Sequence, residues 1–135
     1  MKVLIKEDIC IFVNKSLSDK QYNEELEFLL PHETIKRVKS ILHFDLNGYI
    51  GIISSHSVRH VKKGHPNDIF YICEIMDIIQ NFSKVEKNIT RDHKTGASLI
   101  SLEFYKRYNA QTVKLVKLKV HRTKRLELKT LFIKD

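Results

Sequence analysis

The hydrophobic pattern of the chain changes its period near residue 89, and this change limits the folds available to it. Before that point apolar residues recur at helical spacing, most strongly over residues 69–82. After it, apolar and polar residues alternate as they do in half-buried strands. Helices followed by an antiparallel meander predict an α+β fold. The strands are expected at residues 98–105, 112–120 and 126–133.

Local signals predict the remaining elements. Residues 3–13 are rich in β-branched side chains, which favours a strand or an irregular hairpin. Helices are expected over residues 18–30 and again from His32, because Pro31 separates two apolar patterns of helical spacing. The other expected elements are a buried strand over residues 49–54, a helix between a Ser54 or Ser55 cap and Gly64, a turn near residues 108–110 and a bulge at Leu115–Val116.

The length of 135 residues matches one domain, so residues 1–135 are predicted to form a single unit. No apolar run approaches the ~20 residues that span a bilayer, and charges interrupt the N-terminal apolar stretch. We therefore expect a cytoplasmic protein without a membrane partner. Cys10 and Cys73 each lie among isoleucines, and their wide spacing favours two buried thiols over a disulfide framework.

Positive charge is concentrated in the last part of the chain. Residues 84–135 carry 14 Lys and Arg against 5 Asp and Glu, a net charge of +9, whereas the whole chain carries +8. A basic region of this kind favours a polyanionic partner, most simply a nucleic acid. The alternative is a basic surface that only keeps the protein in solution.

The densest polar cluster lies in residues 54–66. If this segment is helical, His56, Arg59, His60 and Lys63 share one face, and His65 follows the helix end. Imidazoles that titrate near neutral pH can exchange protons with a 2′-hydroxyl, and a guanidinium can stabilise charge on a phosphate. The spacing therefore indicates phosphodiester cleavage. A metal site at His56 and His60 and an ordinary helix surface are the alternatives, but no carboxylate or cysteine lies at metal-ligand spacing.

The predicted strands add further polar candidates. Tyr105, Lys106 and Arg107 come at the end of one strand, where side chains reach the edge of a cleft. Thr130 has the same strand parity as Leu128 and Phe132, so its hydroxyl either faces a phosphate or is simply half-buried in the sheet. No glycine-rich phosphate loop and no GxSxG motif occurs in the sequence.

Several of these runs, in this order, resemble known nuclease-like sequences. They are IGIISSHSVRHVKKGHP, IIQNFSKVE, SLEFYKR, VKLVKLKV and LKTLFI. Together, over residues 49–135, they are similar to the phage-associated families of the barnase–EndoU–colicin–RelE superfold, while residues 1–48 form an unmatched extension. The resemblance implies N-terminal helices, a curved antiparallel sheet of about four strands and a metal-independent RNase from a phage, prophage or other mobile element. It maps site residues onto Ser55, His60, His65, Lys106 and Thr130.

These observations lead to a hypothesis of a small, toxin-like endoribonuclease that needs no metal or cofactor. His60 would act as general acid or base, with His65 or His56 as its counterpart. Arg59 and Lys106 would stabilise the phosphorane, and Thr130 would bind a phosphate oxygen. The residues expected to bind RNA are Ser55, Lys63, Tyr105, Arg107, Lys117 and Lys119.

RNA is the expected partner, and an immunity or antitoxin protein is a candidate second partner. Two other classes of function stay open, namely a non-catalytic RNA-binding module and a protein-interaction module of the same fold. A basic surface also does not distinguish RNA from DNA.

Overall fold

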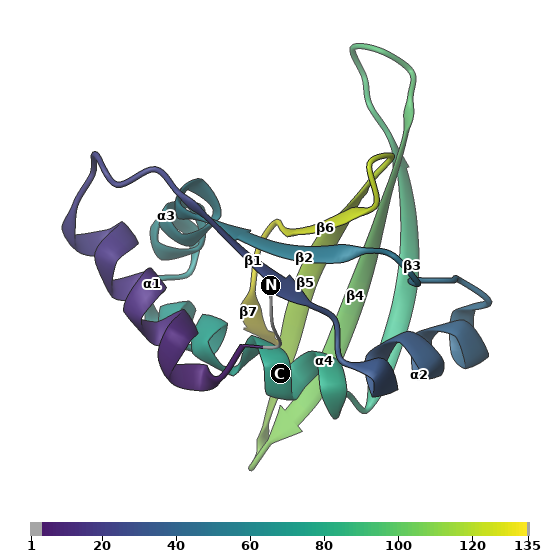
Figure 1. Cartoon of the computed structure of the whole chain (residues 1–135), viewed down its shortest axis with the longest axis horizontal. Coiled ribbons are helices and arrows are strands. Elements are labelled where there is room, and N and C mark those ends of the chain that lie inside the picture. Colours follow the sequence, from purple (N-terminus) through teal and green to yellow (C-terminus); the bar gives the residue numbers. More distant parts are fainter. Residues whose placement is uncertain (1–3, 135) are drawn as a thin grey trace.

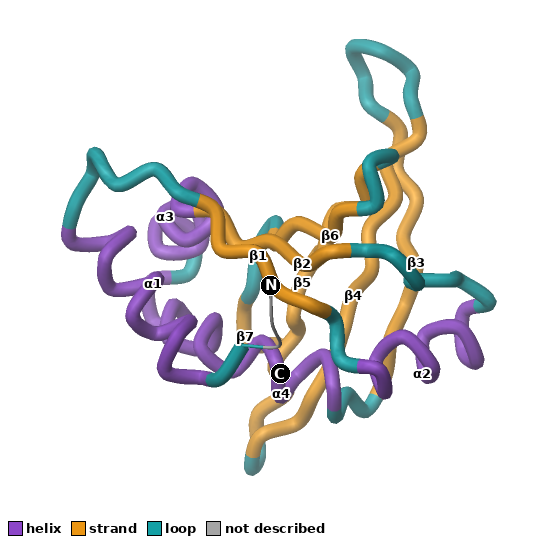
Figure 2. The backbone as a smooth tube through the Cα atoms, in the orientation of Figure 1, coloured by secondary structure: helices purple, strands orange, loops and turns teal. Residues whose placement is uncertain are grey.

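The computed structural model describes residues 4–134, with the backbone alone at positions 111, 113–117 and 134. Within this range the helices pack around one curved sheet, as Figures 1 and 2 show. The α-helices are α1 (Lys6–Ser18), α2 (His32–Leu42), α3 (Ser55–Gly64) and α4 (Ile75–Gln80), and the 3₁₀ helix η1 (Pro66–Glu74) joins the last two. The continuous helix expected over residues 69–82 is therefore a 3₁₀ segment followed by a short α-helix.

Seven strands of the described chain form one mixed sheet. They are β1 (Glu25–Leu29), β2 (Ile50–Ser54), β3 (Lys84–Arg91), β4 (Ser98–Tyr108), β5 (Gln111–His121), β6 (Arg125–Leu128) and β7 (Phe132–Lys134). Their order is β1-β2-β6-β5-β4-β3, with β7 paired to β5. The predicted α+β fold is confirmed. The expected antiparallel sheet of about four strands is wrong, since two strands alternate with the early helices and β2 pairs with β6 in parallel.

The last predicted strand is interrupted. β6 and β7 pair with the same strand, β5, and Leu128↔Leu118 and Phe132↔Lys114 belong to one continuous antiparallel register. Residues 129–131 between them are not in strand conformation. The pairing of β4 with β5 shifts register between Leu102 and Phe104, which places the irregularity opposite residues 116–117 and close to the predicted bulge.

The N-terminal predictions need two corrections. The strand or hairpin predicted over residues 3–13 is wrong for residues 4–13, because the buried residues Ile9, Phe12, Val13 and Ser16 follow helical spacing along α1. Residue 3 lies outside the described residues. Ile9 and Val13 pack in the buried stripe of this helix, whereas Ile5 and Ile11 are exposed. Helical packing of the stripe thus overrides the β propensity of the segment.

The helix expected over residues 18–30 is replaced by a loop and β1. Alternate residues of β1, Leu26 and Phe28, turn toward the core, and β1 pairs with β2 in antiparallel register. Phe28 packs over Gly51 so closely that a Cβ there would lie 2.2 Å from its ring. A glycine on β2 is thus what allows β1 to join the sheet.

A cluster of buried apolar side chains joins the helices to the inner face of the sheet. It includes Ile9 and Phe12 of α1, Val58 and Val61 of α3, and Leu118 of β5. The hairpin loop between β3 and β4 extends away from the helices at the top of Figure 1. The helices therefore leave part of the strand surface, toward this hairpin, uncovered.

The two cysteines are joined in a disulfide, which corrects the prediction of free thiols. Cys10 of α1 and Cys73 of η1 are 63 residues apart, but their Cα atoms lie 5.1 Å apart. This distance is in the usual range for a disulfide. Sequence spacing did not indicate the bond, because it depends on the packing of α1 against η1.

Candidate functional site

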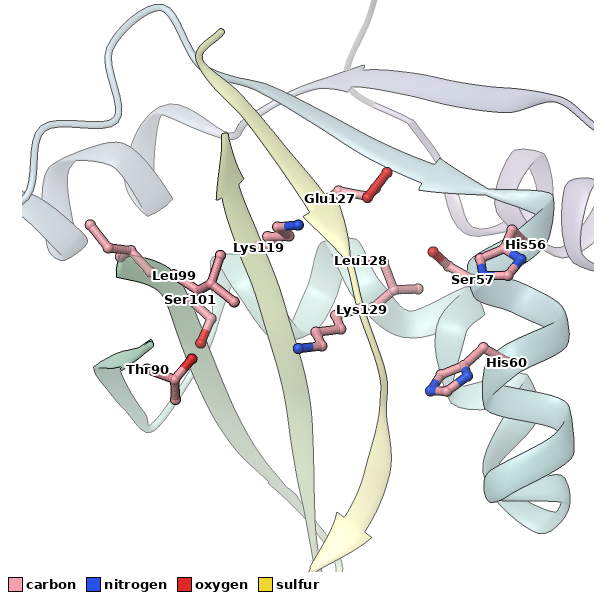
Figure 3. A pocket seen from close by; sticks show the side chains of 11 residues that line it. His56, Ser57, His60, Thr90, Leu99, Ser101, Lys119, Glu127, Leu128 and Lys129 are labelled. Atoms are coloured by element: carbon pink, nitrogen blue, oxygen red, sulfur yellow. The ribbon is translucent and has the colours of Figure 1, made fainter. Parts of the chain in front are cut away.

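A cavity of about 270 Å³ lies between helix α3 and the outer face of the sheet. Figure 3 shows the α3 side chains on one side and those of β3 and β4 on the other, with lysines between them. Its lining residues are His56, Ser57, His60, Thr90, Leu99, Ile100, Ser101, Lys119, Glu127, Leu128 and Lys129.

The cap and the apolar residues of α3 set the direction of its histidines. The Ser54 hydroxyl accepts a hydrogen bond from the Ser57 amide at 3.0 Å, which is a standard helix N-cap. Val58 and Val61 are fully buried and fix the opposite side of the helix. His56 and His60, four residues apart, are therefore exposed on one face and line the cavity.

The register of the strands brings three polar side chains into one row. Lys119 on β5 lies directly opposite Ser101 on β4 and Glu127 on β6. Neighbouring residues Leu118 and Leu128 are buried in the core, so alternation along the strands turns Lys119 and Glu127 outward. The floor of the cavity is thus a cross-strand row with a cation at its centre.

Charges in the cavity are mostly basic. Lys119 and Lys129 stand with the two histidines against one carboxylate, that of Glu127. Glu127 lies 3.5 Å from the imidazole of His121, which belongs to β5. A group with delocalised negative charge, such as a phosphodiester, suits this arrangement of donors.

Three of the predicted site residues, His56, His60 and Lys119, come together in this cavity. The histidines lie on α3 and the lysine on a strand more than fifty residues later. Lys63 and Arg107 are exposed elsewhere, at the end of α3 and near the end of β4. Lys117 lies in β5, but its side chain is outside the described part of the structure.

Arg59 has a structural role instead of the predicted phosphate contact. Its guanidinium donates to the backbone carbonyls of Ser16, Asp19 and Tyr22 and to the side chain of Asn23, at 2.5–3.1 Å. These acceptors belong to the end of α1 and the loop that leads to β1. Arg59 therefore fastens that loop to α3 and does not line the cavity.

Ser55 is also structural, which corrects its assignment to RNA binding. It is 1% exposed. Its hydroxyl accepts hydrogen bonds from the Ser16 hydroxyl at 3.0 Å and from the Glu24 amide at 3.1 Å. The hydroxyl links α1, the loop and α3, and RNA has no access to it.

Lys106 and Tyr108 are held by Asp77 at another part of the sheet. The Asp77 carboxylate accepts hydrogen bonds from the Lys106 ammonium, the Tyr108 hydroxyl and Asn81. Burial acts to raise the pKa of Asp77, but these three donors outweigh it and hold the pKa below its ordinary value. Lys106 is thereby neutralised inside a local network, which corrects its assignment to the phosphorane.

Tyr105 and His65 are engaged as well. Tyr105 is buried and donates to Glu103 at 3.0 Å, so its ring is not open to a base, contrary to its predicted role. Burial and the Glu103 carboxylate raise the pKa of the Tyr105 hydroxyl. His65 is half-buried and stacks on Phe132 with ring centroids 4.9 Å apart. Its imidazole thus packs beside β7 instead of facing the histidines of α3.

Thr130 lies in the interruption between β6 and β7, half-buried and outside the residues that line the cavity. The strand-parity prediction fails there, because residues 129–131 depart from strand conformation and turn Lys129 toward the cavity. The polar cavity residues that sequence reasoning missed are Ser57, Thr90, Ser101, Glu127 and Lys129. Glu127 and Ser101 had a signal, since both occupy polar positions of alternating strands.

Among residues 4–134, no group of three or more His, Cys, Asp or Glu side chains is arranged to hold a metal ion. The same residues include no helix that is both long and apolar enough to cross a membrane.

Comparison of the chain with protein-family models, curated proteins and solved structures finds no match.

Proposed function

We propose that the protein is a small metal-independent endoribonuclease whose reacting phosphate binds in the cavity beside α3. The observation that carries this proposal is that His56 and His60 line one cavity with Lys119 and Lys129. Two imidazoles supply an acid and a base, and two ammonium groups supply positive charge for a phosphorane. Residues of cleavage chemistry from two distant parts of the sequence thus face a common space.

The proposed reaction begins when the neutral imidazole of one α3 histidine takes the proton of a 2′-hydroxyl. The 2′-oxygen forms a bond to phosphorus, and the bond from phosphorus to the 5′-oxygen breaks. The leaving 5′-oxygen takes a proton from the imidazolium of the second histidine. The products are a 2′,3′-cyclic phosphate and a 5′-hydroxyl.

The residue roles differ from those expected from the sequence. Lys119 and Lys129 take the place of Arg59 and Lys106 as phosphate-stabilising cations, because the latter two are bound within the protein. Of the two counterparts expected for His60, His56 is kept and His65 is dropped, since His65 stacks on Phe132. Ser57, whose hydroxyl accepts from Ser54 at 2.8 Å, can donate its own proton into the cavity.

Membership of a phage or mobile-element nuclease family belongs to this proposal and rests on the resemblance of residues 49–135. A single domain, a cytoplasmic location and a neutralising immunity or antitoxin protein also belong to the proposal. Structural disulfides are rare in cytosolic proteins. Alkylation of free thiols after acid quenching and denaturation of whole cells therefore tests the location, because denaturation exposes Cys73, which is buried in the folded protein. Labelling of both cysteines is the result a cytoplasmic protein would give.

The test is cleavage of a mixed RNA pool in excess EDTA by the wild-type protein and by the double variant His56→Ala, His60→Ala. His32→Ala is the matched control, because His32 is exposed at the start of α2. We expect EDTA-resistant cleavage by the wild type and the control, and none by the double variant. A substrate with a 2′-deoxy scissile nucleotide should resist cleavage. Cutting of that substrate would exclude 2′-hydroxyl attack and make DNA a substrate.

A non-catalytic RNA-binding module is the second candidate, favoured by the net charge of +9 over residues 84–135. It predicts binding that weakens steeply with salt and yields no cleaved product. RNA bound by the wild type but left intact over long incubation would support this function over the nuclease. Co-purification of an acidic protein without nucleic acid would instead favour the protein-interaction function.

A further inference from the structure

Charge is unevenly distributed along the cavity. The part beside α3 and β6 holds both histidines, Glu127 and Lys129, and Lys119 lies at the middle. The part formed by β3 and β4 contains no charged side chain among its lining residues, which there are Thr90, Leu99, Ile100 and Ser101. The two parts therefore suit different portions of one ligand.

The uncharged part combines an apolar surface with two available hydroxyls. Leu99 and Ser101 are two residues apart on β4 and so face the same side, and Thr90 on the neighbouring strand is paired with Leu99. Neither the Thr90 nor the Ser101 hydroxyl makes a hydrogen bond to any other described residue, whereas the Ser57 hydroxyl is bonded to Ser54. Both hydroxyls remain free to donate to, or accept from, a ligand.

We propose that Thr90, Leu99 and Ser101 form a subsite for a single unpaired nucleobase, attached to a phosphate held at Lys119. This inference rests on the proposed function, because it places the base next to the reacting phosphate. A nucleobase has a flat apolar face that can lie on Leu99. Its edge carries donors and acceptors that hydroxyls can bind, as serine and threonine do with any base.

The spacing of the strands supports this assignment. Ser101 is directly opposite Lys119, so their strands are separated by one step of about 4.8 Å. A ribose bridges a gap of this order between its base and its phosphate. The cavity of about 270 Å³ is slightly below the range of about 300–1,000 Å³ for sites of drug-sized ligands. One nucleotide suits this volume and a base pair exceeds it.

The substrate class that follows is single-stranded RNA, or the unpaired loops of folded RNA. Bases of a duplex are stacked inside it and cannot enter a pocket between a helix and a sheet, whereas unpaired bases can be turned outward. Cleavage should therefore fall at unpaired nucleotides and vary with the identity of the base over Leu99.

The experiment is a calorimetric titration with the four nucleoside 3′-monophosphates and with inorganic phosphate as probes. The monophosphates lack a 5′-oxygen leaving group, so binding is measured without turnover. At least one of them should bind tenfold or more tighter than phosphate. Ser101→Ala or Thr90→Val should lower the affinity for that nucleotide about fivefold for each hydrogen bond lost, and should leave the affinity for phosphate unchanged. Ser98→Ala, an exposed position on the same strand, and Thr123→Val, exposed in the turn before β6, are the matched controls.

Equal affinity of nucleotides and phosphate would overturn the subsite, as would a matching loss of phosphate affinity in Ser101→Ala. The outcome is separate from that of the nuclease test. Nucleotide-selective binding without RNA cleavage would support the subsite and reject the nuclease. RNA cleavage without nucleotide-selective binding would reject the subsite and leave the nuclease in place. Thermal melting of each variant shows that it is folded before it is titrated.

Discussion

The two sides of α3 carry similar residues and are used in opposite ways. Arg59 and Ser55 on one side form hydrogen bonds to the Ser16 hydroxyl of α1 and to backbone groups of the loop after α1. His56 and His60 on the other side line a cavity. On one short helix, the hydrogen bonds of Arg59 and Ser55 are thus satisfied within the protein. The side chains of His56 and His60 are open to a ligand.

The lysines of the sheet show the same division. Lys106 is bound by Asp77, whereas Lys119 lies in the cavity among groups of mostly like charge. Both had been predicted to meet RNA, and both occupy strands of the basic region. The difference shows that residue type and strand position do not determine whether a lysine is available to a substrate. A nearby carboxylate that pairs with the lysine determines this, and the carboxylate that pairs with Lys106 comes from α4.

The largest effect should follow from substitution on the open side of α3. His60→Ala is expected to lower RNA cleavage about 10²–10⁴-fold, which is the usual contribution of general acid–base catalysis. Its melting temperature should stay near that of the wild type, because His60 is exposed. Single-turnover cleavage and thermal melting measure the two quantities. A loss below tenfold would remove His60 from the mechanism.

The next largest effect concerns the disulfide that holds α1 in place. The side of α3 that carries Arg59 and Ser55 forms its hydrogen bonds with α1 and the loop after it. Cys10→Ser opens a loop of 63 residues, and chain-entropy arguments give a cost of about 4 kcal/mol in unfolding free energy. Urea unfolding of the oxidised wild type and the variant measures it. Wild type treated with a reductant should match the variant. Equal stability of all three would contradict a structural role for the bond.

Arg59→Ala should cost less, about 2–3 kcal/mol of unfolding free energy, because it leaves several backbone carbonyls without their charged donor. Arg59→Lys should restore little of the loss, since an ammonium cannot reproduce the fork of the guanidinium. Cleavage per folded molecule should remain near that of the wild type. A fall in cleavage as large as that of His60→Ala, with stability intact, would return Arg59 to the catalytic site.

The smallest expected effect is on the pH dependence of stability and tests the pairing of Lys106 with Asp77. The pKa of Asp77 is below its ordinary value, so its contribution to stability is present above the unfolded-state pKa. That contribution is lost as the pH falls through the lower folded-state pKa. For a partly exposed pair the loss should be under about 1 kcal/mol. Melting temperatures between pH 2 and 6 should therefore fall less steeply in Asp77→Asn than in the wild type, and identical slopes would contradict the pairing.

Local pattern was sufficient for some elements and not for others. The helix at residues 55–64 and the strands near residues 50–54 and 98–108 were predicted, because each has a cap, a turn or a regular alternation within its own sequence. α1 was missed, since β-branched residues favour strands in isolation, whereas here Ile9 and Val13 pack with Phe12 in the buried stripe of a helix. β1 was missed because its pairing depends on a distant glycine, Gly51.

By itself, the sequence determined the α+β class, the basic C-terminal region and the exposure of His56 and His60 on one helix face. These follow from periodicity and charge, which are properties of neighbouring residues. Only the tertiary structure decided that Lys119 meets those histidines while Lys106 meets Asp77, and that Cys10 bonds to Cys73. Such contacts join residues that lie tens of positions apart, so they depend on how strands and helices pack and not on any local pattern.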